Sequence, residues 1–376
     1  MKKLRFAILP FLFTPYFFAT NMENELPTVK QAPPAYNDGP YVYAIGEKLF
    51  ITYITEENGM KAVQTDSGSI TDKGGKILVV NTDEPGKTFN VELKKNVSDE
   101  KAECKMPAKV LILSDIEGNF AGFRKLLQAN KVIDANLDWI FGEGHLVLGG
   151  DFVDRGSQVT EVLWLIYSME EKAKKAGGYV HYILGNHEIM NLSGDLRYLN
   201  AKYVENSKLM NTHYMTLYGR DSELGKWLRS KNIIERIGDV VVIHAGISAA
   251  INNMELDIRR MNNMSRNFYD DSLYVYPDPR VDTLFGDLGP FWYRGYYAKP
   301  DGNVEGQIKE TLRKFRVDHV VTGHTIVADT VSMWYGGKLF NTDVHHAKGH
   351  SEALLIEDKM YYRVDATGEK KFLKKD

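Results

Sequence analysis

The chain has a single cysteine, Cys104, among its 376 residues. One thiol cannot form a disulfide within the chain, and at this depth it cannot be the acceptor of a lipoprotein anchor. A cysteine-based phosphatase would need an arginine six residues after its cysteine, and that position holds Val110. The cysteine content therefore excludes both a disulfide-stapled domain and this type of thiol chemistry.

The sequence also lacks the loop Gly-x-x-x-x-Gly-Lys-Ser/Thr, which excludes a P-loop nucleotide triphosphatase. It has no excess of basic residues, because 47 lysines and arginines face 50 aspartates and glutamates, for a formal net charge of −3. We therefore expect no nucleic-acid partner. With 43% hydrophobic and 26% charged residues, the composition is that of a soluble globular protein with a large core and room for a small second domain.

The apolar run near the N-terminus is too short for a transmembrane helix, which needs roughly 20 residues. This run, Phe6–Ala19, has 14 residues and follows Lys2, Lys3 and Arg5. The pattern predicts a secretory signal peptide within residues 1–21. Because no convincing small-x-small cleavage site follows, an uncleaved N-terminal anchor stays open as the alternative. We expect an exported protein, periplasmic or secreted, that meets a membrane only through this segment.

Composition divides the rest of the chain into segments. Residues 22–40 are polar and contain prolines, which predicts a linker. Residues 41–95 hold short β-rich runs separated by turns, which predict a small antiparallel β domain that either docks a substrate or only packs against its neighbour. Residues 96–107 form a charged connector, residues 108–365 the main domain, and residues 366–376 a basic, solvated tail.

From Lys109 onward, apolar strand-like runs alternate with helical patterns. Strands are predicted at 110–114, 145–149, 179–184, 240–244 and 318–322, with short strands at 331–335, 338–342, 352–357 and 359–364. Helices are predicted near 120–130, 158–176, 199–230 and 305–315, and residues 252–287 are predicted to be irregular. Alternation followed by late strands indicates a layered α/β core with mixed sheets.

The most informative segment is Gly-Gly-Asp151-Phe-Val-Asp154-Arg155-Gly156, which follows an apolar run. It places two carboxylates and a guanidinium on a tight turn at the C-terminal end of a buried strand, the edge where open α/β sheets bind ligands. Aspartate is a hard ligand for a divalent cation, and the planar fork of arginine matches phosphate oxygens. A metal and a phosphate held side by side suggest phosphoryl chemistry. Taken alone, the segment is also compatible with a capped turn that carries a surface ion pair.

Four other predicted strands run into polar residues in the same way. Glycines beside these residues allow sharp turns and a close approach to an anion. One strand that ends in Asp or His means little, but five in order favour a binding site. The four segments are Asp115-Ile-Glu117, Asn186-His187-Glu188, His244-Ala-Gly246 and Gly323-His324-Thr325.

These blocks resemble those of the calcineurin-like metallophosphoesterase superfamily, whose usual forms are Gly-Asp-x-His-Gly, Gly-Asp-x-x-Asp-Arg-Gly, Gly-Asn-His-Glu, His-Gly/Ala-Gly and Gly-His. The resemblance extends over residues 109–357. Residues 190–198 and the segment Trp292-Tyr293-Arg294 are similar to the bacterial-type branch of the phosphoprotein phosphatases, the Shewanella-like phosphatases. The resemblance implies a four-layer sandwich of two mixed sheets flanked by helices.

The resemblance also implies a site for two divalent metal ions. Two such ions about 3.5–4 Å apart can activate a water and hold phosphate oxygens at once. The implied bridging ligand is Asp151. The implied ligands of the first metal are Asp115 and Glu117, and those of the second are Asn186, His244 and His324.

The remaining implied roles concern proton transfer and phosphate binding. His187 is the implied general acid, and Asp154 is expected to hold its ring and raise its basicity. Arg155 and Arg294, with Asn186, are the implied phosphate contacts. Arg197 is either a third phosphate contact or part of a structural ion pair.

Two positions depart from the family pattern. Where the family has Asp-x-His this chain has Asp115-Ile-Glu117, and a carboxylate ligand favours Mn²⁺ or Mg²⁺ over softer ions. We therefore expect Mn²⁺, with Mg, Fe or Zn as alternatives. The other interpretation of Glu117 is that it leaves the first metal weakly held or the activity low. The second departure is Asn341-Thr-Asp343-Val-His345-His346, in which His345 or His346 either supplies the missing imidazole or lies exposed in a loop.

Together these features predict a metal-dependent phosphomonoesterase of the protein-phosphatase type, in which a metal-bridging hydroxide attacks phosphorus and His187 protonates the leaving oxygen. The expected substrates are Ser, Thr or Tyr phosphates on peptides and small phosphomonoesters. One alternative is a bis-nucleoside polyphosphate hydrolase, against which the Trp292-Tyr293-Arg294 segment argues. The other is a non-catalytic binding protein that retains the fold, suggested by Glu117 and opposed by the retention of His187 and both arginines.

Overall fold

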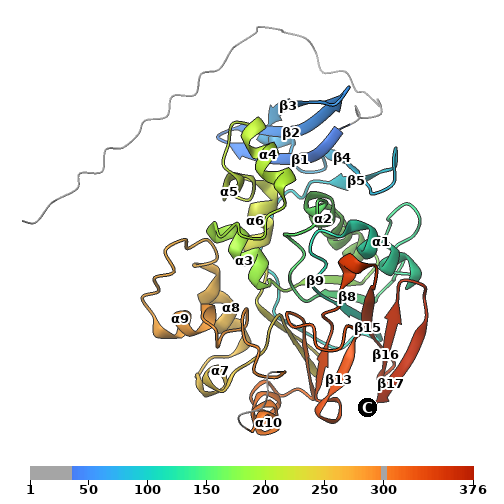
Figure 1. Cartoon of the computed structure of the whole chain (residues 1–376), viewed down its shortest axis with the longest axis vertical. Coiled ribbons are helices and arrows are strands. Elements are labelled where there is room, and N and C mark those ends of the chain that lie inside the picture. The colour runs from blue at the N-terminus through green and yellow to red at the C-terminus, as the bar shows by residue number, and fades with distance from the viewer. Residues whose placement is uncertain (1–35, 298–302) are drawn as a thin grey trace, which may run out of the picture. The chain divides into compact units, whose positions relative to one another are not determined.

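The computed structural model describes residues 36–297 and 303–376 (Figure 1). The predicted signal peptide or anchor at residues 1–21 and most of the predicted linker lie outside these residues. The first strand begins at Tyr36, inside the segment predicted to be a linker. Within the described part of the chain, no helix has both the length and the apolar character needed to cross a membrane.

The first central sheet is built around three parallel strands and has the order β17-β16-β15-β7-β8-β9. Each of its parallel strands comes from an apolar run with buried side chains. The later strands pair antiparallel along the other side of β7. The bounds are β7 Lys109–Leu113, β8 His145–Leu148, β9 Tyr179–Tyr182, β15 Glu352–Glu357, β16 Met360–Asp365 and β17 Lys370–Lys375.

The second central sheet has the order β13-β14-β12-β11-β10-β6. Strands β11, β12 and β14 are parallel to one another, and β10 pairs antiparallel with β11. The bounds are β6 Glu103–Cys104, β10 Ile234–Ile237, β11 Val240–Ile243, β12 His319–Thr322, β13 Ser332–Trp334 and β14 Leu339–Asn341.

Period-two alternation gives the two sheets a shared core. In β7, Val110 and Ile112 pack in an apolar cluster with Val240 and Val242 of β11. The residues that alternate with them, such as Leu111, belong to a second cluster with the helices. Because one face of each sheet meets the other sheet and the opposite face meets helices, the architecture is the predicted four-layer sandwich.

Helices cover the outer faces. Helix α2 packs against β9 of the first sheet, and α8 packs against β10 of the second. The bounds are α1 Phe120–Ala129, α2 Val159–Lys175, α3 Asn186–Ser193, α4 Ala201–Leu209, α5 Tyr214–Leu217, α6 Glu223–Arg229, α7 Ala249–Asn253, α8 Ile258–Arg266, α9 Pro279–Phe285 and α10 Val304–Phe315.

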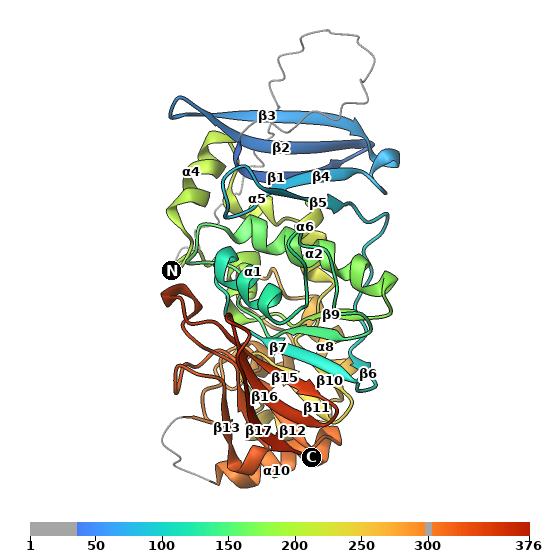
Figure 2. The same cartoon turned by 90° about the vertical axis from the view of Figure 1, so that its right-hand side faces the viewer.

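The N-terminal β-rich region forms an antiparallel sheet of β1 (Tyr36–Ile45), β2 (Lys48–Glu57) and β3 (Met60–Ser69), and a hairpin of β4 (Ile77–Asn81) and β5 (Thr88–Glu92). Both pack on the side of α2 that faces away from β9 (Figure 2). Arg124 of α1 forms a two-pronged ion pair with Asp83 in the hairpin, with both N···O distances at 2.7 Å. The region therefore lies on the helices of the main domain, and the described residues form one compact unit with it.

Three segments differ from the sequence-based expectation. The interval 252–287 is not irregular but contains α8, α9 and the end of α7, whose first turns are capped by the side chains of Ser248, Asp257 and Asp278. The basic tail is not free in solvent, because β17 pairs with β16 through its backbone, and Lys374 is partly buried while the other lysines of the strand are exposed. The predicted connector contains β6, which pairs with β10.

Candidate functional site

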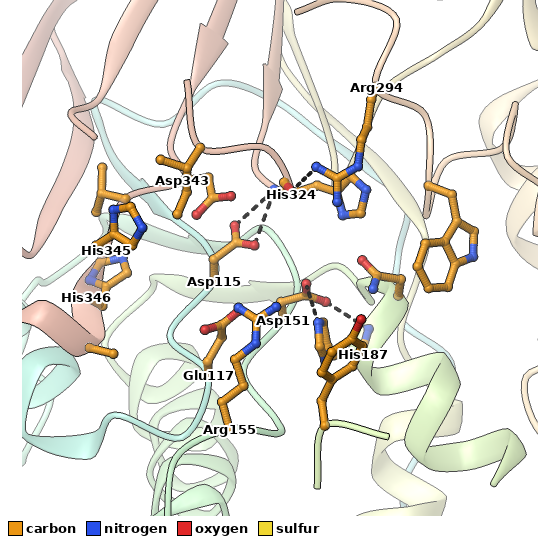
Figure 3. A pocket seen from close by; sticks show the side chains of 16 residues that line it. Asp115, Glu117, Asp151, Arg155, His187, Arg294, His324, Asp343, His345 and His346 are labelled. Carbon is orange, nitrogen blue, oxygen red and sulfur yellow. Dashed lines mark hydrogen bonds and ion pairs between the residues drawn. The ribbon is translucent and has the colours of Figure 1, made fainter. Parts of the chain in front are cut away.

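Six strand ends meet at one edge of the two sheets. Strands β7, β8 and β9 in the first sheet, and β11, β12 and β14 in the second, are each parallel to their neighbours, so the polar residues that follow them converge. They surround a cavity of about 310 Å³ (Figure 3). The predicted site residues that line it are Asp115, Glu117, Asp151, Arg155, Asn186, His187, Arg294 and His324. The other two, Asp154 and His244, are fully buried against this lining.

The turns after these strands hold an unusual backbone conformation. Left-handed φ angles at non-glycine residues cost about 1–2 kcal/mol each, and such strain is concentrated at functional sites. Two features require glycine at position 150. Its φ is +96°, and an added Cβ would lie 2.6 Å from Nδ1 of His244. The left-handed residues with side chains at the site are Asp115 (56°), Glu117 (49°), Asp151 (61°), Asp154 (69°), Arg155 (54°) and His324 (66°).

Glu188 fixes the turns after β8 and β9 to each other. Its Oε2 accepts hydrogen bonds from the backbone N–H of Asp151 (2.9 Å) and Gly185 (2.7 Å). Its Oε1 accepts from the N–H of Phe152 (2.8 Å) and the hydroxyl of Tyr182 (2.9 Å). The side chain is fully buried, so it positions Asp151 without reaching the cavity. The sequence carries Glu188 in the Asn-His-Glu segment, but no role for it was predicted.

Asp151 lies at the centre of the site. Its Oδ1 accepts the backbone N–H of His187 at 2.9 Å, and its Oδ2 lies 3.1 Å from Nε2 of His244. Burial opposes its charge, but His244 and His187 outweigh that effect and hold the pKa of Asp151 well below its usual range. The carboxylate is therefore ionised and faces positively charged or electron-poor groups.

The tautomer of His244 suits a cation at its Nε2. Its Nδ1 lies 2.8 Å from the carbonyl oxygen of Gly149, which can only accept, so Nδ1 carries a hydrogen. Its Nε2 faces Oδ1 of Asn186 at 2.9 Å and Oδ2 of Asp151. Burial opposes the charge on this ring, but Asp151 and Asp115 raise the pKa of His244 to about 10. A proton satisfies this convergence of acceptors, and a divalent metal ion would do so in its place.

His324 and Asp115 complete the wall on the other side of Asp151. The Nε2 atom of His324 is buried and has no hydrogen-bond partner, and its ring lies edge-on to that of His244 with centroids 5.0 Å apart. Asp115 accepts the backbone N–H of His324 at 3.1 Å. An unpartnered imidazole nitrogen beside two carboxylates fits a metal ligand.

Four carboxylates share the cavity: Asp115, Glu117, Asp151 and Asp343. Burial and the neighbouring Asp151 raise the pKa of Asp115 to about 7, although His244 opposes the rise. Burial, Asp115 and Glu117 raise the pKa of Asp343 well above its ordinary value. So much negative charge in one buried place is unfavourable without cations, and divalent metal ions would offset it.

Glu117 differs from the other carboxylates because it is paired with an arginine. Its Oε1 forms a close ion pair with Arg155, whose guanidinium also lies over the ring of Tyr198 at 5.5 Å. Burial raises the pKa of Glu117, and Arg155 only partly opposes this. Glu117 is thus at the cavity as predicted, but it is paired with Arg155, one of the three residues predicted to contact phosphate.

His187 and Asp154 form the predicted pair. Nδ1 of His187 lies 2.7 Å from Oδ2 of Asp154, whose other oxygen accepts a hydrogen bond from Asn191 at 2.8 Å. Burial opposes the charge on His187, but Asp151 and Asp154 raise its pKa to about 9. The ring is therefore fixed in place with a proton on Nε2 directed into the cavity, as a general acid requires.

The predicted arginines take different places. Arg294 is exposed, and its Nη1 donates to the carbonyl of His324 at 3.1 Å and to Oγ1 of Thr325 at 3.0 Å, which hold it at the cavity. Arg197 forms an ion pair with Asp195 at 2.7 Å and is not among the residues that line the cavity. Arg197 thus follows the structural alternative.

His345 and His346 both line the cavity, but neither ring has a demonstrated ligand position. Nδ1 of His345 lies 2.9 Å from Asp329, and Nδ1 of His346 lies 3.1 Å from the hydroxyl of Ser351. The Nε2 atom of His346 is buried without a partner. Compensation for Glu117 by one of these rings stays a prediction, and Asp343 is a further candidate that the sequence reasoning did not name as a ligand.

Two sets of candidate metal ligands share Asp151. In each set the ligand atoms lie within 4.8 Å of one another: Asp151 with His244 and His324, and Asp151 with Glu117 and His187. A shared carboxylate between two sets is the arrangement expected of a two-metal site. Trp292 and Tyr198, which also line the cavity, add aromatic walls beside these groups.

Comparisons with known proteins agree with this geometry. Residues 108–328 match the family described as calcineurin-like phosphoesterase. The solved structure of a cold-active protein-tyrosine phosphatase from a psychrophilic Shewanella species is 36% identical, covers 90% of this chain and 99% of that chain, and has a TM-score of 0.80.

Two curated proteins are also similar to this chain. Shewanella-like protein phosphatase 1 of Plasmodium berghei is 25% identical over 59% of this chain and 62% of its own length. Shewanella-like protein phosphatase 2 of Arabidopsis thaliana is 31% identical over 29% of this chain and 28% of its own length. This chain therefore spans less than two thirds of either curated relative.

Proposed function

The chain belongs to the calcineurin-like phosphoesterase family, and from this premise we propose that it is a metal-dependent protein phosphatase that also hydrolyses small phosphomonoesters. The observation that carries the proposal is the cavity at Asp151. There Asp151 forms a candidate ligand set with His244 and His324, beside the imidazole that Asp154 holds in place and two arginines. Phosphate release that is lost when divalent metal is removed and restored by added Mn²⁺ would test this activity.

The ligands proposed for the two ions follow the sequence prediction. Asp115, Glu117 and the shared Asp151 would hold one ion, and Asn186, His244 and His324 with Asp151 would hold the other. When bound, the two ions would lower the pKa of a water, making it a nucleophile, and would bind phosphate oxygens.

The protein's own groups account for the rest of the reaction. Arg294 and Arg155 bind the phosphate oxygens and stabilise the charge that develops on them. Arg155 must leave Glu117 to do so, or bridge both. His187 donates its Nε2 proton to the leaving oxygen, and Asp154 keeps the ring in the tautomer and orientation that this transfer needs.

We propose phosphotyrosyl peptides as the preferred substrates, with phosphoseryl and phosphothreonyl peptides as weaker ones. The support is twofold: the aromatic side chains of Trp292 and Tyr198 line the cavity and offer packing surfaces for a phenyl ring, and the Shewanella relative that matches over nearly its whole length is described as a protein-tyrosine phosphatase. Hydrolysis rates on peptides that differ only in the phosphorylated residue would test this choice. Equal or higher kcat/KM on the phosphoseryl peptide would contradict it.

Arg294→Ala should lower kcat/KM by about 100-fold or more, because a charge-assisted contact to phosphate is worth a few kcal/mol. Steady-state kinetics with a phosphotyrosyl peptide would measure the loss. The matched control is Arg197→Ala, which removes an exposed arginine whose partner is Asp195 and which does not line the cavity. Kinetics of Arg294→Ala indistinguishable from those of the control would remove Arg294 from the phosphate site.

Glu117→His should change the metal preference and raise the turnover. The change restores the Asp-x-His pattern, removes one of four crowded carboxylates and frees Arg155 from its ion pair. We propose that the natural enzyme prefers Mn²⁺, since a carboxylate ligand favours hard ions. Activity measured across Mn²⁺, Mg²⁺, Zn²⁺ and Fe²⁺ would show the shift. An unchanged metal profile together with unchanged turnover would place Glu117 outside the metal site.

We also propose that the chain is exported, on the support of the basic residues and short apolar run within residues 1–21. Cell fractionation with N-terminal sequencing is expected to find the protein outside the cytoplasm, either shortened at its N-terminus or tethered to a membrane. Recovery of the full-length protein from the cytosolic fraction alone would contradict export.

A further inference from the structure

A second group of side chains that could hold a metal ion lies between the two central sheets, away from the catalytic cavity. It consists of Cys104 of β6, His145 of β8 and His181 of β9. Asp151 follows the C-terminal end of β8, whereas His145 is the first residue of that strand, so the group lies toward the opposite edge of the sheet. Strands β6 and β10 of one sheet and β7 and β9 of the other are labelled in Figure 2.

The group interrupts an otherwise apolar layer. Val147 and Ile183, two residues after His145 and His181, belong to the cluster that joins the two sheets, as does Ile237 of β10. By strand alternation the two histidines face the same layer. Polar groups in such a layer are costly unless they have partners, and departures of this kind mark functional sites.

The three ligand atoms lie close together. Nδ1 of His145 is 2.9 Å from Nε2 of His181, and Sγ of Cys104 is 4.0 Å from each of these nitrogens. Zinc–nitrogen bonds are about 2.0–2.1 Å and zinc–sulfur bonds about 2.3 Å long. With the atoms where they stand, a point in their common plane meets all three of these bond lengths. Three protein ligands leave one position of a four-coordinate zinc ion to a further ligand.

A carboxylate behind the group fixes the tautomer that a metal ligand needs. Oε2 of Glu235 lies 2.6 Å from Nδ1 of His181, and its Oε1 accepts from the side chain of Asn232 at 2.8 Å. A hydrogen on Nδ1 leaves the lone pair of the neutral ring on Nε2, which faces Cys104 and His145. Metal-binding histidines in proteins donate their second nitrogen to a carboxylate in this way.

The residues of the group differ in burial. His181 is 3% exposed and Glu235 is 1% exposed, so the two are held by the core. Cys104 and His145 are partly exposed, which leaves a path for an ion to enter.

We propose that Cys104, His145 and His181 form a third metal site, for a zinc-class divalent ion, with Glu235 as the residue that orients His181. One thiolate and two imidazoles suit Zn²⁺ and disfavour the hard ions suited to the catalytic carboxylates. Since the ligands come from both sheets, the ion ties β6 to β8 and β9. Binding releases the thiol proton and adds to the stability of the folded state.

The single thiol makes the test specific. Cobalt(II), a spectroscopic substitute for zinc, gives a thiolate-to-cobalt charge-transfer band only when sulfur is a ligand, and Cys104 is the only cysteine. Cobalt in the catalytic cavity therefore cannot produce this band. We expect the band on titration of the full chain, its displacement by Zn²⁺, and its loss in Cys104→Ser with phosphatase activity retained.

Glu235→Gln should weaken cobalt binding at this site by about 10- to 100-fold, the usual effect of losing the carboxylate behind a histidine ligand. The control Glu352→Gln changes another buried glutamate that lies outside the group and should leave the affinity unchanged. A second measurement uses the unmodified protein: Zn²⁺ should slow the reaction of Cys104 with a thiol reagent by about 10-fold or more.

The proposal would be overturned if the wild-type protein showed no charge-transfer band at millimolar cobalt and Zn²⁺ did not slow thiol modification. The proposal would also be overturned by an equally strong band in His145→Ala, provided that circular dichroism shows this variant to be folded. None of these readouts depends on phosphatase activity, so failure of this site and failure of the proposed function are distinguishable.

Discussion

Asp151→Asn is expected to abolish metal binding at the catalytic cavity and to lower turnover at least about 1,000-fold, equivalent to about 4 kcal/mol in the barrier. The change keeps the shape of the side chain, and its Oδ1 can still accept the N–H of His187. It removes the one charge shared by both candidate ligand sets. An amide nitrogen in place of Oδ2 would also face Nε2 of His244. Elemental analysis and steady-state kinetics measure the two losses.

The control for this variant is Asp195→Asn, which changes an aspartate that does not line the cavity. Circular dichroism should show both variants folded, because the hydrogen bonds of Glu188 hold the backbone at Asp151 without using its side chain. Metal content and turnover equal to those of the control would remove Asp151 from the centre of the site.

His187→Asn is expected to lower kcat by about 10²- to 10⁴-fold on substrates with poor leaving groups, the usual contribution of a general acid. The loss should shrink as the leaving group becomes a weaker base, because p-nitrophenolate departs without a proton. A series of aryl phosphates of graded acidity, compared with a phosphotyrosyl peptide, measures this trend. An equal loss on every substrate would assign His187 a structural or metal-binding role. The distance of 3.8 Å between Nε2 of His187 and Oδ2 of Asp151 is compatible with a metal-binding role.

The pH profile provides a further readout of the same pair. His187 must be protonated to act as an acid, so kcat is at its full value below the pKa of His187 and falls as the pH rises through that pKa. Burial lowers this pKa, but Asp151 and Asp154 raise it to about 9. Asp154→Asn removes part of the raising effect and should move the alkaline fall of kcat to lower pH. An alkaline limb that stays in place would separate Asp154 from the acid.

The sequence predicted the parts of the fold that follow from strong local patterns. The runs before Asp115, Asp151 and His324 are short and apolar, glycine directly follows the last two, and all three runs form buried strands. The four-layer arrangement came from the family resemblance, since alternation alone does not specify how two sheets stack. The comparisons and the observed sheets confirm that resemblance.

Several strands and helices form from segments whose sequence has no strong apolar pattern. Strand β3 is mostly polar and exposed, and it forms because it pairs with all of β2. Strand β17 carries four lysines and looked like a tail, yet pairing with β16 stabilises it at the sheet edge, where lysines discourage further pairing. The helices between 249 and 285 depend on side-chain caps and tertiary packing that override a polar composition.

At the site, the sequence identified the candidate ligands but not the interactions among them. Strand ends and motif spacing placed ten predicted residues in or against one cavity. The ion pair between Glu117 and Arg155 joins two turns that are 38 positions apart, and no spacing rule anticipates it. The contribution of Asp343 to the carboxylate cluster depends in the same way on tertiary approach. Cys104, dismissed as a lone thiol, acquires two histidine neighbours only when the two sheets stack.

The most direct test of the central claim is phosphate release from a phosphotyrosyl peptide by the full chain, first freed of metal with a chelator and then titrated with Mn²⁺. The account predicts no release from the metal-free protein and recovery that saturates as about two ions bind per chain. In Asp151→Asn, added Mn²⁺ should restore nothing. Unchanged release in the presence of the chelator would contradict a metal-dependent phosphatase, as would a fully metal-loaded wild-type protein that releases no phosphate.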